Sequence, residues 1–267
     1  MPNAIALLTA ICGFLLSTSP TTFGCTIFVA SRGGVVLAGN NEDNAAGFNP
    51  DTRIWFHPPK PGCYGMMFLG YADRVPQGGM NDHGLFFDGA TLPNGSQCLF
   101  GDASGKTAIL ELTPQKPSTH SKDEGIQLID QMMGGCATVE EALALLESRL
   151  HADGVRFNVV RGNGDFQIAT NFQQSITSGE KVTCKRFQAA TKMLSGNAPL
   201  TVDLFRSILK ATHQEGKVKT FYSNVCDLKN GVIYLYDRAN FDRAVELRLS
   251  EELQKGERDL RLSDLFK

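Results

Sequence analysis

The chain lacks several features that would assign it to a class at once. It contains no apolar run of about 18 to 20 residues, the length that a membrane-spanning helix needs. Neither sign of charge is in excess, because 26 Lys and Arg face 28 Asp and Glu among 267 residues. Nucleic-acid binders, by contrast, usually show a basic face. With 42% hydrophobic and 20% charged residues, we expect one globular domain without a membrane span or a nucleic-acid partner.

Metal-binding and phosphate-binding motifs are missing as well. The seven cysteines form no C-x-x-C pair and the five histidines form no H-E-x-x-H, so no metal site is expected. The cysteines are too sparse for a disulfide scaffold, and most of the six that follow Cys12 are interpreted as small buried hydrophobes, with Cys25 as the exception. Gly105-Lys106-Thr107 resembles the end of a phosphate-binding loop, but Phe100 occupies the position where that loop needs glycine. We therefore interpret it as a hairpin turn.

The first residues are typical of an export signal. Residues 4–16 carry no charge, and Ser17, Thr18, Ser19 and Pro20 follow them. This pattern resembles the apolar and polar regions of a secretory signal, although no Lys or Arg precedes it. A buried N-terminal helix is the alternative. We expect a signal peptide or propeptide over residues 1–24, a single domain over residues 25–267, and a secreted or periplasmic protein.

Hydrophobic periodicity predicts strands near both ends and helices between them. Residues 25–30 and 35–38 are expected to form a hairpin, followed by a polar loop at 39–43. The Thr138 hydroxyl and the Glu141 carboxylate form a capping box before a helix. The other expected segments are strands at 84–88 and within 98–112, strand-like residues at 156–170, a hairpin at 221–227 and 232–236, and helices at 124–133, 139–150, 187–194 and 202–213. The order predicts a layered α+β domain.

Cys25 carries unusual chemistry if the leader ends at Gly24. It then holds a thiol and a free α-amine on one residue, with reference pKa values of roughly 8.5 and roughly 7.7 to 8.0. The amine can take the thiol proton near neutral pH without a histidine, which is a known way to activate a nucleophile. The structural alternative is that Cys25 merely begins a core strand.

Several short motifs resemble one family in their order along the chain. They are Cys25-Thr26, Gly39-Asn40-Asn41-Glu42-Asp43, residues 78–85, Thr170-Asn171-Phe172, Lys185-Arg186-Phe187 and residues 221–228. Together they are similar to the C-T, G-R-N-x-D, G-x-N-E-x-G-L, T-N and R-F elements of the choloylglycine hydrolase and penicillin V acylase family of N-terminal-nucleophile cysteine hydrolases. The resemblance implies a four-layer αββα sandwich with antiparallel sheets, and hydrolysis of linear amide C–N bonds.

The same resemblance implies a role for each matching residue. Cys25 would attack the amide carbonyl and form a thioester that water hydrolyses. Asp43 would hold the α-amine toward the thiol. Asn171 would donate to the oxyanion, with the backbone N–H of Thr91 as the second donor. Arg186 would place positive charge near the sulfur and favour the thiolate. Without the resemblance, Asp43 and Asn171 could be turn residues and Arg186 a solvated helix-end charge.

One departure and several alternatives accompany this interpretation. Asn40 stands where the family usually has Arg, so a guanidinium beside the nucleophile is missing. The N-N-E-D run also resembles the R-N-E-D of N-terminal-cysteine dipeptidases, and an acyltransferase is a further alternative on the same fold. An exported, non-catalytic binding protein is the rival from another class.

The expected partner is a small-molecule amide with an apolar acyl group. By resemblance, its candidates are phenoxyacetyl penicillins, conjugated bile acids, N-acyl amino acids and N-acyl homoserine lactones. Residues 54–56 and Phe86-Phe87 are expected to line an apolar pocket for the acyl group. No cofactor is expected, and a homo-oligomer is among the assembly states left open.

Activity would require cleavage of the Gly24–Cys25 bond. Two routes would free the amine of Cys25, and a third would block it. Signal peptidase could cut there directly, or cut near Ser19 and leave a short propeptide that Cys25 removes itself. Gly24, without a Cβ, would ease that approach. The third route is a lipoprotein junction, which would acylate Cys25 and abolish catalysis, although Thr22-Phe23 fits such a junction poorly.

Overall fold

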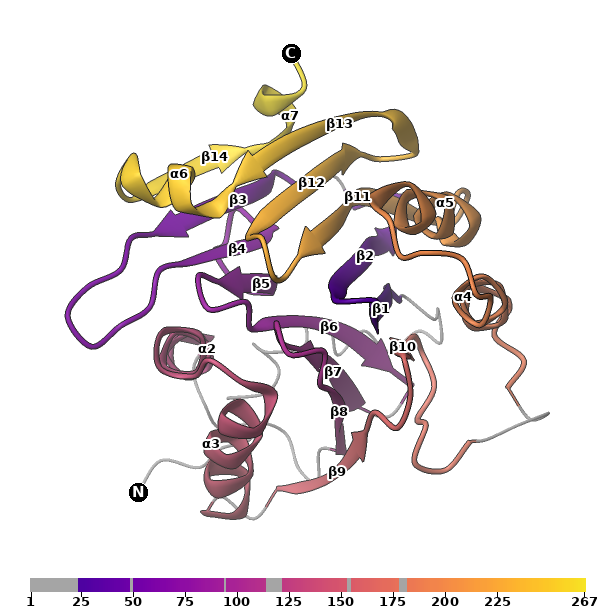
Figure 1. Ribbon diagram of the computed structural model, residues 1–267, viewed down its shortest axis with the longest axis horizontal. Helices are drawn as coiled ribbons and strands as arrows, with labels where there is room; N and C mark the ends of the chain where they lie inside the picture. Colours follow the sequence, from indigo (N-terminus) through magenta and orange to yellow (C-terminus); the bar gives the residue numbers. More distant parts are fainter. Residues whose placement is uncertain (1–23, 49, 94, 114–121, 153–154, 178–181) are drawn as a thin grey trace.

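A computed structural model describes residues 24–267 except 49, 94, 114–121, 153–154 and 178–181 (Figure 1). Apart from Gly24, the predicted leader therefore lies outside the described residues. The strands are β1 (Thr26–Arg32), β2 (Val35–Ala45), β3 (Thr52–His57), β4 (Met66–Tyr71), β5 (Pro76–Asn81), β6 (Phe86–Leu92), β7 (Gly95–Gly101), β8 (Thr107–Thr113), β9 (Arg156–Arg161), β10 (Phe166–Ala169), β11 (Val218–Asp227), β12 (Val232–Asp237), β13 (Asn240–Arg248) and β14 (Arg258–Arg261). The helices are α2 (Lys122–Gly135), α3 (Val139–Ala152), α4 (Lys185–Leu194), α5 (Val202–Thr212), α6 (Leu249–Gln254) and α7 (Leu262–Leu265).

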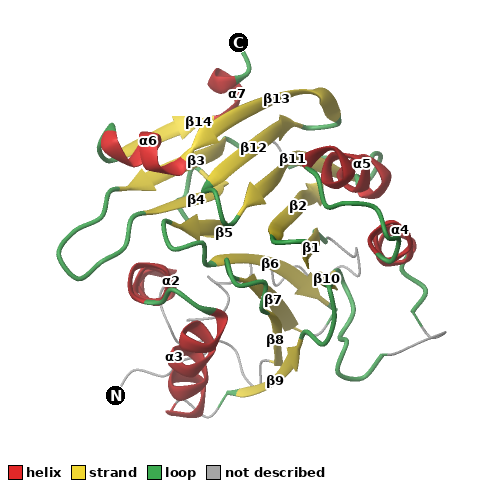
Figure 2. Cartoon of the chain, in the orientation of Figure 1, coloured by secondary structure: helices red, strands yellow, loops and turns green. Residues whose placement is uncertain are grey.

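Two antiparallel sheets form the centre of the molecule. The six-stranded sheet has the order β10-β1-β2-β11-β12-β13, and the eight-stranded sheet has the order β14-β3-β4-β5-β6-β7-β8-β9. Helices α2 and α3 contact the eight-stranded sheet, whereas α4 and α5 contact the six-stranded one. Figure 2 shows these two helix pairs on opposite outer sides of the sheets. The expected four-layer αββα sandwich is confirmed.

Strand periodicity explains why both faces of each sheet are buried. Successive side chains point to opposite faces. In β4, Met66 and Phe68 therefore pack toward the helices, while Met67 and Leu69 pack between the sheets. In β1, Phe28 likewise packs under α4 and α5, opposite its neighbours. The resulting apolar runs are nearly continuous, as in other sheets that are covered on both sides.

The expected polar loop at residues 39–43 is wrong, because β2 continues through this segment. Buried polar side chains need hydrogen-bond partners, and Asn41 shows how this segment obtains them. Asn41 donates from Nδ2 to the Leu209 carbonyl and to the Thr212 hydroxyl, both at 3.0 Å, and accepts from the Ser223 hydroxyl at 2.6 Å. These partners come from α5 and β11, which a local reading of the sequence does not reveal.

The predicted helices and the first hairpin are confirmed within a few residues. The turn Gly33-Gly34 has positive φ at both positions, the conformation of a two-residue hairpin with the favoured twist. In the capping box, the backbone N–H of Glu141 donates to the Thr138 hydroxyl, and the Glu141 carboxylate accepts from the N–H of Thr138, both at 3.2 Å. Strands β3 to β5 and everything after β12 were not anticipated.

The strand-like residues 156–170 form β9 and β10, and these two strands end different sheets, the eight-stranded and the six-stranded one. One further expectation needs correction. The expected pocket residues 54–56 and Phe86-Phe87 belong to the core, each at most 2% exposed. Their alternating side chains divide between two core layers instead of lining a pocket.

Candidate active site

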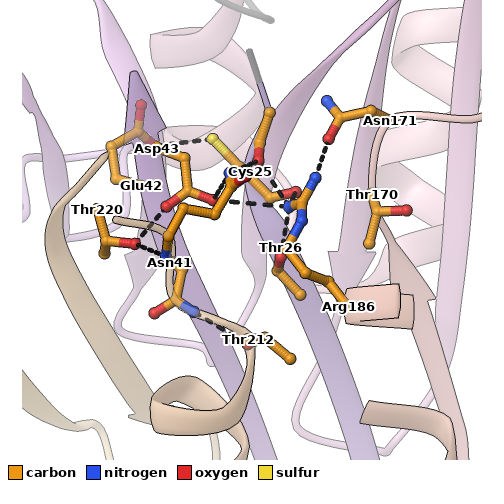
Figure 3. Close-up of polar contacts among 12 residues, drawn as sticks. Cys25, Thr26, Asn41, Glu42, Asp43, Thr170, Asn171, Arg186, Thr212 and Thr220 are labelled. Atoms are coloured by element: carbon orange, nitrogen blue, oxygen red, sulfur yellow. Dashed lines mark hydrogen bonds and ion pairs between the residues drawn. The ribbon is translucent and has the colours of Figure 1, made fainter. Parts of the chain in front are cut away.

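Strand register places Cys25, the expected nucleophile, next to residues of β2 and to the segment that follows β10. Cys25 immediately precedes β1, which lies between β10 and β2. Ile27 pairs with Ala169, so continuing this antiparallel register places Asn171 level with Cys25. Thr26 pairs with Asn41, which likewise places the next residue of β2 beside Cys25. Segments far apart in the sequence therefore meet at one end of β1 (Figure 3).

Asp43 lies in a buried, hydrogen-bonded pocket next to Cys25. Its Oδ1 accepts from the Thr220 hydroxyl at 2.5 Å, and its Oδ2 accepts from Gln214 Nε2 at 2.7 Å. The Arg186 guanidinium lies 3.5 Å from Oδ2. Burial raises the pKa of Asp43 to about 6, against the lowering effect of these hydrogen bonds and of the Arg186 charge. Asp43 is therefore mostly ionised at neutral pH and can hold a cationic amine.

Arg186, at the start of α4, joins the other site residues. Its Nη1 donates to the carbonyls of Gly24 and Cys25, at 2.6 and 3.0 Å, and to the Thr26 hydroxyl at 2.6 Å. Its Nη2 donates to Asn171 Oδ1 at 2.5 Å. An effect of its charge on the Cys25 thiolate stays a prediction. Within the described chain, its hydrogen bonds reach the backbone on both sides of the Gly24–Cys25 bond and two side chains.

Asn171 and Thr91 meet as expected, but through a different group of Thr91. Asn171 Nδ2 donates to the backbone carbonyl of Thr91 at 2.7 Å. The anticipated oxyanion donor was the Thr91 N–H, and that role stays a prediction.

The sulfur faces a carboxyl group that sequence reasoning did not assign. Cys25 Sγ donates to Glu42 Oε2 at 3.4 Å, and the Tyr71 hydroxyl donates to Glu42 Oε1 at 2.8 Å. Burial raises the pKa of Cys25 well above its ordinary value, and the charges of Glu42, Asp43 and Asp88 raise it further. Cys25 is therefore a protonated thiol in the full-length chain, and it needs a base before it can attack.

Burial also raises the pKa of Glu42 to about 7, and the charge of Asp43 acts in the same direction. Hydrogen bonds from Tyr71, Cys25 and Asn40 lower it in part. Asn40 Nδ2 lies 3.5 Å from Glu42 Oε2, so the residue that replaces the family Arg contacts this carboxyl group.

The five predicted site residues thus converge, and four neighbours were missed. The polar pattern of residues 39–43 predicts a loop, so it gives no signal that Glu42, within the N-N-E-D run, reaches the sulfur. Tyr71, Gln214 and Thr220 carry no local signal, since β4, the connection between α5 and β11, and β11 bring them here only in the folded chain. Among the described residues, no group of three or more His, Cys, Asp or Glu is placed to hold a metal ion.

A β-bulge in β11 shapes the region beside the nucleophile. Thr220 pairs with Asp43 and Tyr222 with Glu42, so Phe221 is left out of register. Bulges of this kind often lie next to active sites, where they redirect a side chain. The ring of Phe221 meets that of Phe48 edge to face at 6.1 Å, and Phe48 meets Tyr71 at 5.3 Å. Phe48 is 40% exposed, so this aromatic cluster reaches the surface.

A cavity of about 710 Å³ lies along β9, β10 and α4. Phe172 and Phe187, which follow Asn171 and Arg186 in sequence, are among its lining residues. Cys25 is not among them. We therefore do not assign this cavity to the reacting part of a substrate.

Comparisons with known proteins agree with this architecture. No protein-family model and no curated protein matches the sequence. Among solved structures, two variants of conjugated bile acid hydrolase from Clostridium perfringens give TM-scores of 0.55 and 0.54. They are 15% and 17% identical, and the matches cover 89% of this chain and 97% and 96% of theirs. Penicillin V acylase from Agrobacterium tumefaciens gives 0.50 at 14% identity, covering 89% and 92%.

The chain has the N-terminal-nucleophile hydrolase fold. The similarity to these hydrolases extends over most of each chain, so the sequence-based expectation of this fold is confirmed. Cys25 directly precedes β1, the first strand of the described chain. The helices of the described residues include none long and apolar enough to cross a membrane.

Proposed function

We propose that this chain hydrolyses linear amide C–N bonds, with Cys25 as its N-terminal nucleophile. The observation that carries the proposal is the set of contacts made by Arg186. One guanidinium contacts the Cys25 carbonyl, the Asn171 side chain and the Asp43 carboxylate at the same time. The names of the solved neighbours, a conjugated bile acid hydrolase and a penicillin V acylase, support the same chemistry.

The reaction uses the chain end that appears once residues 1–24 are removed. The α-amine of Cys25 takes the proton from Sγ, and the sulfur attacks the substrate carbonyl carbon. The tetrahedral intermediate collapses, the C–N bond breaks, and the ammonium returns the proton to the leaving amine. Water then hydrolyses the thioester, which releases a carboxylic acid and restores the thiol. An amine with a pKa near neutral suits both proton transfers.

Three residues support these steps without attacking the substrate. Asp43 accepts a hydrogen bond from the α-ammonium, because its own carboxylate is mostly ionised at neutral pH. Asn171 donates to the oxyanion of the intermediate, and one such donor contributes about 3 kcal/mol. Arg186 can only donate, so it keeps Asn171 Oδ1 turned toward itself and Nδ2 turned away.

The aromatic cluster of Phe48, Tyr71 and Phe221 is the proposed contact for the apolar acyl group. Tyr71 bonds to the carboxyl group that accepts from Cys25 Sγ, so the cluster adjoins the nucleophile. An exposed aromatic ring that packs against two others offers apolar surface to a ligand. This assignment replaces the core residues that the sequence suggested.

Substitution of the nucleophile tests the proposal. We expect Cys25→Ser to lose nearly all turnover against a panel of acyl amides, when each protein is supplied with residue 25 as a free N-terminus. Cys226→Ser is the matched control, since Cys226 is a buried thiol on β11. Equal hydrolysis by Cys25→Ser and wild type would eliminate the mechanism. Ligand binding without turnover in the wild type would favour the non-catalytic binding protein.

Removal of residues 1–24 and export are part of the same proposal. The uncharged run at 4–16 supports a secretory leader, and the placement of Gly24 in the site supports cleavage after it. Intact-mass measurement of exported protein is the test. A mass beginning at Cys25 supports the enzyme, whereas a lipid increment on Cys25 contradicts it.

A further inference from the structure

In the full-length chain, the Gly24–Cys25 bond occupies the site like a substrate. The Gly24 carbonyl accepts from Arg186 Nη1 at 2.6 Å and from Gln214 Nε2 at 3.2 Å. Two donors on one carbonyl oxygen polarise the bond and stabilise the oxyanion that attack on its carbon produces. A Cβ on residue 24 would lie within 1.8 Å of the Asn171 side chain, so any larger residue would displace Asn171 from its present position.

The base of the finished enzyme does not exist at this stage. The nitrogen of Cys25 is an amide while Gly24 is attached, and an amide nitrogen cannot take the thiol proton. Burial and three nearby carboxylates hold the pKa of the thiol well above its ordinary value, so it does not ionise by itself near neutral pH. Cleavage from within the chain therefore requires another proton acceptor beside the sulfur.

Glu42 is the carboxyl group to which the thiol donates. Its Oε2 accepts from Cys25 Sγ at 3.4 Å, while the Tyr71 hydroxyl on Oε1 fixes the carboxyl plane. Asn40 also donates to Oε2 at 3.5 Å. Glu42 is only 3% exposed, so bulk water does not readily replace it as the acceptor.

We propose that Glu42 is the internal base for self-cleavage of the Gly24–Cys25 bond. The inference rests on the proposed function, because it explains how that nucleophile gains its free amine. Glu42 accepts the Sγ proton as the sulfur attacks the Gly24 carbonyl carbon. The C–N bond then breaks, Glu42 passes the proton to the Cys25 nitrogen, and Gly24 remains as a thioester. Water hydrolyses the thioester into the carboxyl group of Gly24 and the thiol of Cys25.

The role of Glu42 is confined to maturation. Once the α-amine is free, it is attached to the same residue as the thiol and serves as the base for substrate turnover. Glu42 therefore acts on the chain itself, and Asp43 serves the mature amine. This division gives the two neighbouring carboxylates of β2 different functions.

Cell-free synthesis of the full-length chain without membranes or signal peptidase tests the proposal. Intact mass measured over time should show wild-type chain converting to residues 25–267. Glu42→Gln keeps an acceptor for Tyr71 but cannot take a proton, and we expect it to convert at least about 100-fold more slowly. Glu252→Gln, which changes a buried carboxylate on α6, should convert at the wild-type rate.

The pH dependence separates a proton acceptor from a merely structural residue. A base acts in its ionised form, so the wild-type conversion rate should rise through about pH 7, the pKa of Glu42. The ionisable groups that face Glu42 are Cys25, Asp43, Tyr71 and Tyr222. The Tyr71 hydrogen bond lowers the pKa of Glu42, so Tyr71→Phe should shift the midpoint to higher pH. Thermal unfolding confirms that each variant is folded.

Each outcome of these experiments either supports or overturns the role of Glu42 as the base. Conversion of Glu42→Gln at the wild-type rate, or faster because a charge that suppresses thiolate is gone, would overturn the proposal. Wild-type chain that never converts without membranes would also overturn it. If wild type matures and Glu42→Gln does not, yet the mature protein hydrolyses no amide, the proposed function fails while the role of Glu42 stands.

Discussion

The side-chain amide of Asn171 has two chemically different ends, and its neighbours determine their orientation. Arg186 has only donors, so it faces the oxygen, and the Thr91 carbonyl has only lone pairs, so it faces the nitrogen. The residue is therefore held with its N–H groups toward β6 and the chain end. A preorganised donor of this kind lowers the barrier without reorienting during the reaction.

Replacement of Asn171 tests its assignment as an oxyanion donor. We expect Asn171→Ala to reduce kcat by about 10² to 10³, with a small change in KM, because the lost contact forms mainly in the transition state. Steady-state kinetics on mature protein measures both constants. Asn197→Ala, at an exposed loop position, is the control. A rise in KM alone would make Asn171 a substrate-binding residue.

At the scale of elements, β2 and β11 position many of the residues that surround the thiol of Cys25. Strand β2 places Glu42 and Asp43 on successive residues, so their side chains leave opposite faces of the six-stranded sheet. Glu42 therefore contacts the sulfur of Cys25, and Asp43 contacts Thr220 and Gln214. The bulge in β11 lets Thr220 stay opposite Asp43 while Phe221 turns toward Phe48.

The aromatic cluster beside this bulge gives a prediction about substrate choice. We expect Phe48→Ala to raise KM roughly 10-fold for amides with a large apolar acyl group, and to leave acetyl amides nearly unaffected. The reason is the loss of apolar contact area, worth about 1 to 2 kcal/mol. Kinetics with an acyl-length series provides the measurement, with Ile176→Ala as the control at another exposed hydrophobic residue. An equal effect on all acyl lengths would contradict this subsite.

At the scale of the whole molecule, the fold bears the cost of burying carboxylates around a thiol. The pKa of Glu42 is raised from 4.5 to about 7, and that of Asp43 from 3.8 to about 6. The folded state therefore holds their protons more tightly than the unfolded state does. Their unfavourable contribution is absent below the unfolded pKa values and develops as pH rises toward 7.

Stability should consequently decline with pH across this window. In the Cys25→Ala background, which prevents cleavage, we expect the free energy of unfolding to fall between pH 4.5 and 7 by on the order of 3 kcal/mol from Glu42. Adding Glu42→Gln should flatten this part of the profile, whereas adding Glu252→Gln should leave its slope unchanged. Urea unfolding at a series of pH values measures the free energy of unfolding of each variant. An unchanged slope in Glu42→Gln would show that its pKa is not raised.

The sequence by itself determined the class of fold, most helix positions and the five residues expected at the site. Local patterns carry that information: the capping box at Thr138, the turn at Gly33-Gly34, and short motifs around Cys25 and Arg186. Only the tertiary structure decided that residues 39–43 form a buried strand and that Glu42 faces the sulfur. A run of polar side chains in a sequence is typical of a solvent-exposed loop. Such side chains are stable inside a protein only when distant elements supply hydrogen-bond partners, and here α5, β4 and β11 supply them in the folded chain.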